Sequence, residues 1–147
     1  MPSSRPKRAR LVSGFFTSRP APKSEEDRQT NVFLFGNPIL FPPNRIRGGK
    51  FVFDGREYVF PVNEPKTGCF IHGNLLNLAF SVAKKTENEI VFEYFAKSRE
   101  YLGFPHDFGV KRRYKLGENG LEEFTTITND GADEMPVMLA YHTTKTP

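Results

Sequence analysis

Residues 44–72 read NRIRGGKFVFDGREYVFPVNEPKTGCFIH, and this stretch decides the fold. Two short β-rich runs, 50–53 and 56–60, flank the pair Asp54-Gly55. Asp-Gly readily adopts the positive φ angles of a type I′ turn, so the stretch predicts a tight β-hairpin. A hairpin folds the chain back on itself. We therefore expect Arg45 and His72, which lie on either side of it, to share a cleft at one end of a sheet.

Length and composition limit what such a cleft belongs to. The chain has 147 residues, enough for one domain with a core. Every apolar run is far shorter than the roughly 20 residues that cross a bilayer, so we expect no membrane span.

The single cysteine, Cys69, excludes an internal disulfide and fits a reducing compartment such as the cytoplasm. We expect it to be a small buried side chain rather than a nucleophile or metal ligand.

The positive charge is concentrated at the N-terminus. Residues 1–30 hold seven basic and three acidic side chains, whereas residues 31–147 hold 14 of each. This basic leader also has four prolines and little apolar content, so we predict that residues 1–30 are disordered. Its PKRAR run (residues 6–10) would suit a nucleic-acid patch or a nuclear signal, and its composition partly resembles a transit peptide. A solvated tail without function is the simplest interpretation.

From residue 31 onward, short runs with period-two alternation predict strands. In one run, Phe108, Val110 and Tyr114 alternate with Lys111, Arg113 and Lys115, as in a half-buried antiparallel strand. No long segment has helical periodicity, which favours an all-β sandwich over a fold of alternating strands and helices. The other strands that we predict span residues 76–82, 89–97, 121–128 and 135–141.

Several short motifs occur in an order that resembles a known family. They are GNPILFP (36–42), NRI (44–46), IHG (71–73), GFP (103–105) and YHTT (141–144). None is specific alone, but together with the hairpin they resemble the aldose 1-epimerases, also called galactose mutarotases. The resemblance runs from about Asn31 to Thr144 and implies that residues 31–147 form a partial galactose mutarotase-like domain, an incomplete antiparallel β-sandwich.

The resemblance also implies a function and roles for four residues. The family interconverts the α and β anomers of a hexose such as glucose or galactose, with no cofactor. By similarity, His142 is the general acid to the ring oxygen, while Arg45 and His72, with Asn44 beside them, bind the substrate and stabilise charge. A histidine suits acid catalysis because its pKa lies near working pH, whereas an arginine can only orient and stabilise.

The resemblance leaves one catalytic role unfilled, because no residue of this sequence corresponds to the glutamate that is the family's general base. We therefore expect impaired activity in a truncated chain, unless a complementary C-terminal half is supplied. The alternatives are a non-catalytic carbohydrate-binding or partner-binding module and an interaction protein led by its basic tail. The neutral body shows no basic stripe with interleaved aromatics, so we expect no nucleic-acid partner and no membrane partner.

Two further assignments concern the remaining histidine. We expect His106 to be a loop histidine paired with Asp107 rather than a sugar ligand. Residue type alone would allow a zinc site from Cys69, His72, His106 and His142. Their spacing matches no known zinc pattern, so we predict no metal.

Overall fold

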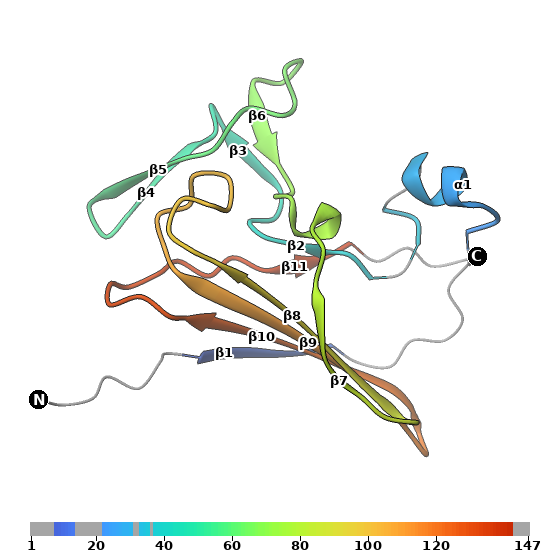
Figure 1. Ribbon diagram of the computed structural model, residues 1–147. Coiled ribbons are helices and arrows are strands. Elements are labelled where there is room, and N and C mark those ends of the chain that lie inside the picture. The colour runs from blue at the N-terminus through green and yellow to red at the C-terminus, as the bar shows by residue number, and fades with distance from the viewer. Residues whose placement is uncertain (1–7, 14–21, 31–32, 36, 143–147) are drawn as a thin grey trace, which may run out of the picture. The chain divides into compact units, whose positions relative to one another are not determined.

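The structure, a computed structural model, describes residues 8–13, 22–30, 33–35 and 37–142 (Figure 1). The chain divides into two compact units. One contains Lys50–Pro61 and Ala79–Val137 together with the first strand, and the other contains Phe16–Gly49, Val62–Leu78 and Met138–Pro147. We refer to them as the sheet unit and the site unit.

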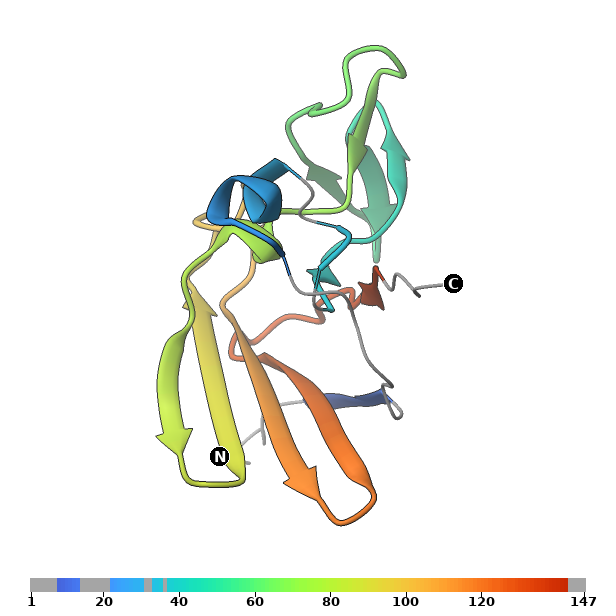
Figure 2. The same ribbon diagram turned by 90° about the vertical axis from the view of Figure 1, so that its right-hand side faces the viewer.

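A five-stranded antiparallel sheet dominates the sheet unit, with the strand order β1-β10-β9-β8-β7. Figure 2 shows the β7–β8 and β9–β10 turns at the same end of this sheet. The strands are β1 (Arg8–Ser13), β7 (Ser81–Lys85), β8 (Glu89–Ala96), β9 (Phe108–Gly117) and β10 (Gly120–Asn129).

Burial alternates along β10, one of the two longest strands. In β10 the side chains of Glu123, Thr125, Ile127 and Asn129 are buried, and the residues between them are half-buried. Ile127 lies opposite the buried Val110 of β9, so the two side chains share a face of the sheet. The strands predicted at 89–97, at 121–128 and around Phe108 to Lys115 are therefore confirmed.

The predicted hairpin is also present in the sheet unit, as β4 (Lys50–Phe53) and β5 (Arg56–Val59). Asp54 and Gly55 have φ angles of 48° and 71°, as a type I′ turn requires. The ring of Phe51 stacks on that of Tyr58 with their centroids 4.8 Å apart. Tyr58 is buried, so the hairpin is anchored in an aromatic core.

The site unit is built from short elements. The strand β2 (Ile39–Leu40) pairs with β11 (Ala140–Tyr141), and β3 (Arg45–Arg47) pairs with β6 (Cys69–Ile71), both antiparallel. Its described residues include the helix α1 (Glu25–Thr30) and the 3₁₀ turn η1 (Leu75–Asn77). Ile39, Leu40 and Phe70 are almost completely buried and belong to its core.

Two predicted strands are wrong in extent. Residues 76–82 divide between η1 and β7, because Asn77 donates hydrogen bonds from its backbone and its side chain to Asn74 and closes a local turn. Of residues 135–141, only Ala140 and Tyr141 form a strand. Polar side chains and proline therefore shorten these elements below the length that their apolar residues suggest.

The predicted leader contains two described elements. Strand β1 pairs with β10 from Arg8 to Ser13, and α1 begins after Ser24, whose Oγ accepts a hydrogen bond from the backbone nitrogen of Asp27 at 3.0 Å. Residues 1–7 and 14–21 lie outside the described residues, so the domain boundary after residue 30 stays a prediction. No helix among the described residues is long and apolar enough to span a membrane.

Candidate functional site

The pairing of β3 with β6 brings Arg45 and His72 together. Arg45 lies opposite Ile71 in the register, so His72 follows directly after the residue that faces Arg45. The chain enters β3 from Asn44 and leaves β6 at His72, and these two residues meet at one end of the pair. The segments on either side of the hairpin therefore lie together, as the sequence predicts, because they form a short pair of strands.

Two hydrogen bonds join Asn44 and His72. The backbone N–H of His72 donates a hydrogen bond to the carbonyl oxygen of Asn44 at 3.2 Å. The backbone N–H of Asn44 donates one to Nδ1 of the His72 ring, also at 3.2 Å. Both residues have left-handed backbones, with φ angles of 61° and 65°. Asn is among the residues that tolerate this conformation best.

The Asn44 bond fixes the protonation pattern of His72. A backbone N–H can only donate, so Nδ1 accepts, and the proton of the neutral ring resides on Nε2. Burial lowers the pKa of His72, and the charges of His142 and Arg45 lower it further, while Glu64 opposes them. His72 is therefore neutral near pH 7, with Nε2–H as its available donor.

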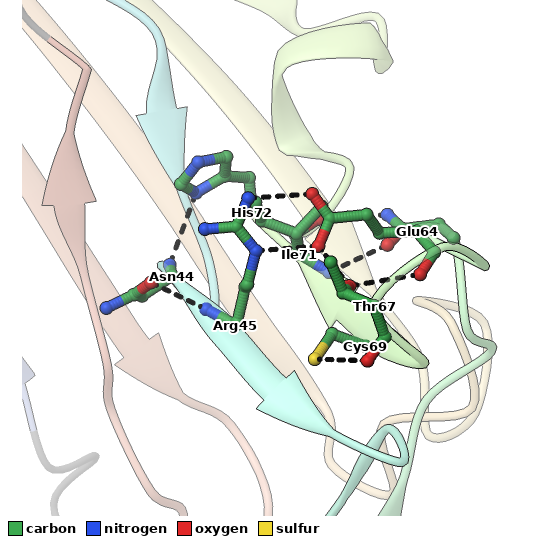
Figure 3. A network of polar contacts seen from close by, with 8 residues as sticks. Asn44, Arg45, Glu64, Thr67, Cys69, Ile71 and His72 are labelled. Atoms are coloured by element: carbon green, nitrogen blue, oxygen red, sulfur yellow. Dashed lines mark hydrogen bonds and ion pairs between the residues drawn. The ribbon is translucent and has the colours of Figure 1, made fainter.

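A bidentate ion pair holds Arg45 (Figure 3). Its Nε lies 2.6 Å from Oε2 of Glu64, and its terminal Nη2 lies 2.7 Å from Oε1. The hydroxyl of Thr67 also donates to Oε2. The hydrogen bonds from Arg45, then from Thr67, lower the pKa of Glu64 to about 2, and the same pair raises the pKa of Arg45. Glu64 is therefore a carboxylate throughout the physiological range.

The loop that carries Glu64 is closed by its own backbone. Glu64 and Cys69 exchange two backbone hydrogen bonds, of 3.0 and 3.3 Å. Gly68 turns the chain with a φ of 65°, a conformation that glycine adopts at no steric cost. This turn sets the Glu64 carboxylate beside β3, the strand that begins with Arg45.

His142 reaches the same place from the other end of the chain. It follows β11, and its backbone nitrogen donates to the carbonyl oxygen of Pro38 at 3.0 Å. Its ring lies edge-on to that of His72, with their centroids 5.9 Å apart at an interplanar angle of 85°. Phe33 contacts both rings, at 4.9 Å from His142 and 5.6 Å from His72.

One atom of His142 is left without a partner. Its Nδ1 is buried and makes no hydrogen bond within the described part of the chain. A buried polar atom without a hydrogen-bond partner destabilises the folded state by roughly 1–3 kcal/mol unless another group pairs with it. The imidazole is thus prepared to form a hydrogen bond that the described residues do not supply.

The other two residues considered for a site behave differently. Cys69 is buried as predicted, and its Sγ contacts the carbonyl oxygen of Thr67 at 3.4 Å. His106 lies in the sheet unit, where its Nε2 is 2.7 Å from the hydroxyl of Tyr58. Its predicted pairing with Asp107 is wrong, because that carboxylate accepts hydrogen bonds from residues 97 and 98.

Metal binding has no support from the described residues, in which no group of three or more His, Cys, Asp or Glu side chains could hold an ion. Of the four residues weighed for zinc, His72 and His142 come together, whereas the buried His106 contacts an aromatic core.

The sequence prediction missed three residues of the site. Glu64 pairs with Arg45, and Thr67 donates a hydrogen bond to Glu64. Asn63 accepts a hydrogen bond from the backbone nitrogen of Ile71 at 2.7 Å and donates one to its carbonyl oxygen at 2.9 Å. The only signal for them was the turn-forming sequence Pro65 to Gly68, which places Glu64 opposite Cys69. That signal locates a turn but does not say which cation the carboxylate meets.

The chain is similar to proteins of one known family. The sequence model of the family described as Aldose 1-epimerase matches residues 19–144. A protein of Arthroderma benhamiae named "Probable aldose 1-epimerase" is 32% identical over 129 residues, which are 80% of this chain and 29% of that protein.

Solved structures give the same result. A galactose mutarotase-like protein from Clostridium acetobutylicum has a TM-score of 0.71 at 32% identity, covering 83% of this chain and 38% of that one. A second, from Lactobacillus casei, has a TM-score of 0.58 at 24% identity over 71% of this chain and 33% of that one, and shows the fold alone. The chain spans less than half the length of these relatives. Since the family match extends over residues 19–144, the chain belongs to the aldose 1-epimerase family and has the all-β galactose mutarotase-like fold.

Proposed function

We propose that this chain binds a hexose such as glucose or galactose at Arg45, His72 and His142, with Asn44 holding His72 in place. The convergence of the two imidazoles, whose centroids are 5.9 Å apart, carries the proposal. The charge of Arg45 lies near enough to lower the pKa of His72, so the guanidinium belongs to the same cluster. Two imidazoles and a guanidinium offer the donors and acceptors that sugar hydroxyls require.

These groups also suit part of the chemistry of anomer interconversion. That reaction removes a proton from the anomeric hydroxyl and gives one to the ring oxygen, so that the ring opens, C1 rotates and the ring closes again. We assign the proton donor to His142, whose buried Nδ1 has no partner among the described residues. The Nε2–H of His72 and the remaining N–H groups of Arg45 donate hydrogen bonds and stabilise developing charge.

The same groups are poor bases. Arg45 is permanently charged, and His72 uses Nδ1 to accept a hydrogen bond from Asn44. Glu64 makes two hydrogen bonds with Arg45 and has a pKa of about 2. If His142 is the acid, it cannot accept a proton in the same step. We therefore propose that this chain alone converts anomers slowly and that the general base comes from a complementary segment.

Binding tests the first part of the proposal. Calorimetric titration with glucose or galactose should give saturable heat that Arg45→Ala removes. Arg56→Ala is a matched control, because Arg56 lies in the sheet unit and pairs with Asp133. Absence of heat from the unaltered chain at hexose concentrations of about 100 mM would refute the proposal. Any remaining binding free energy would then be weaker than roughly 1.4 kcal/mol.

Polarimetry tests the second part. The optical rotation of freshly dissolved α-glucose should relax slightly faster with the chain than in buffer, and His142→Gln should remove the gain. Binding without any gain in rate would identify a carbohydrate-binding module and refute the catalytic assignment of His142.

A location in a reducing compartment such as the cytoplasm remains a prediction from the single cysteine.

A further inference from the structure

We infer that Glu64 determines which sugars the site accepts: by pairing with Arg45 it fixes the guanidinium and cancels its charge, so that an uncharged hexose binds in preference to an anionic sugar. The inference rests on the proposed function, because it concerns the same site. It adds a residue that the sequence prediction did not include and a class of ligand that the site rejects.

The geometry supports the positioning role. Arginine offers five N–H donors in a planar fork, and Glu64 engages the edge formed by Nε and Nη2. Figure 3 shows this edge facing the carboxylate. Nη1 makes no hydrogen bond with the described residues and is left for a sugar oxygen. Thr67 holds the carboxylate in turn, so the guanidinium cannot rotate without breaking several bonds.

The charges support the selective role. His72 is neutral near pH 7, because burial lowers its pKa and Asn44 occupies Nδ1. Glu64 remains ionised and offsets the positive charge of Arg45. Without that carboxylate, an unpaired guanidinium would lie beside two imidazoles, which is the kind of cluster that binds phosphate and carboxylate groups. Glu64 thereby makes the site suitable for a neutral polyol.

A purely structural role for the pair would give different results. If Glu64 served only to close its turn, the backbone bonds between Glu64 and Cys69 would keep the loop, and ligand preference would not depend on the charge. Glu64→Gln tests this difference, because the amide keeps the shape of the side chain and removes its charge. Glu89→Gln is the matched control: Glu89 also pairs with a cation, Lys84, and is 17% exposed, compared with 25% for Glu64.

The experiment compares the binding of glucose, glucose 6-phosphate and glucuronate by calorimetry at low and high salt. The unaltered chain and Glu89→Gln should prefer glucose. Glu64→Gln should bind the two anionic sugars more tightly by roughly fivefold, the effect of one exposed charge at about 4 Å, and salt should reduce the gain. An unchanged preference in Glu64→Gln would overturn the inference, as would tighter binding of glucose 6-phosphate than of glucose by the unaltered chain.

A measurement without ligand separates this inference from the proposed function. In a ¹⁵N spectrum of the chain alone, the Nε–H of Arg45 should be protected from exchange with water by its bond to Glu64. The protection should fall in Glu64→Gln, whose neutral amide oxygen binds the guanidinium more weakly, and should be unchanged in Glu89→Gln. Unchanged protection in Glu64→Gln would overturn the positioning role. If the unaltered chain bound none of the three sugars, the proposed function would fail and the selectivity would fail with it, whereas the signal of Arg45 would still report on the clamp.

Discussion

The backbone N–H of Asn44 donates a hydrogen bond to Nδ1 of His72 at 3.2 Å, and the backbone N–H of His72 donates one to the carbonyl oxygen of Asn44 at the same distance. This reciprocal pair joins two segments 28 residues apart in sequence. It fixes the orientation and the tautomer of one imidazole beside Arg45.

Protonation of His72 should destabilise the junction. Burial, followed by the charges of His142 and Arg45, lowers the pKa of His72, so the unfolded chain binds more protons than the folded one between the two pKa values. The stability linked to neutral His72 is complete above about pH 6.5 and is lost as the pH falls through the lowered folded pKa. His72→Asn, which accepts from Asn44 but does not titrate, should reduce this loss in urea unfolding at about pH 7.5 and about pH 5.

His106 must be considered in the same experiment, because burial lowers its pKa as well. The chain that keeps His106 and carries His72→Asn should therefore retain part of the pH dependence. A pH dependence identical to that of the unaltered chain would show that His72 is not linked to folding.

Asn44 should tolerate glycine better than alanine. Its φ of 61° is left-handed, which costs a residue with a Cβ about 1–2 kcal/mol. Both substitutions remove the side-chain oxygen that accepts from the backbone nitrogen of Arg45 at 2.8 Å, so that loss cancels in the comparison. The free energy of unfolding of Asn44→Ala should be about 1 kcal/mol below that of Asn44→Gly. Equal stability of the two variants would contradict the backbone geometry.

The Tyr58–His106 pair should act as a buried structural contact. Tyr58 and His106 are 2% and 3% exposed, and the tyrosine hydroxyl lies 2.7 Å from Nε2. Tyr58→Phe leaves the imidazole nitrogen without a partner and should cost about 1–3 kcal/mol, measured by urea unfolding. The double variant Tyr58→Phe/His106→Leu should recover part of this loss, because both polar groups are then gone. A double variant no more stable than the single one would argue against the contact.

Two ion pairs of the same sheet should contribute differently to stability because they differ in burial. The side chains of Arg112 and Glu123 are 14% and 2% exposed, so Glu123→Gln removes the charge of Glu123 from a largely buried ion pair and should cost about 3–5 kcal/mol. Glu89→Gln breaks the pair with Lys84, whose side chain is 56% exposed, and should change the midpoint of thermal unfolding little. Similar shifts in the two variants would contradict the assigned difference in burial.

Local sequence predicted the parts of the fold that local physics decides. Asp54-Gly55 specified the hairpin, and the alternation along β9 and β10 specified two long strands. Glu64 was missed because its role depends on the register of β3 against β6 and on the turn that returns the chain to Cys69, which no periodicity encodes. The resemblance to a family supplied the roles of Arg45, His72 and His142. The hairpin predicted that Arg45 and His72 lie together, whereas the position of His142 beside them depends on topology that no local pattern encodes.

The most direct test of the hexose site uses the three histidines of the chain. Their Cε1 resonances can be followed by NMR during titration with glucose or galactose. The signals of His72 and His142, whose rings meet at 5.9 Å, should shift together along one saturating curve. The signal of His106, buried against Tyr58, should remain in place. Resonances of His72 and His142 that stay unchanged, or that shift no more than His106, would contradict the account.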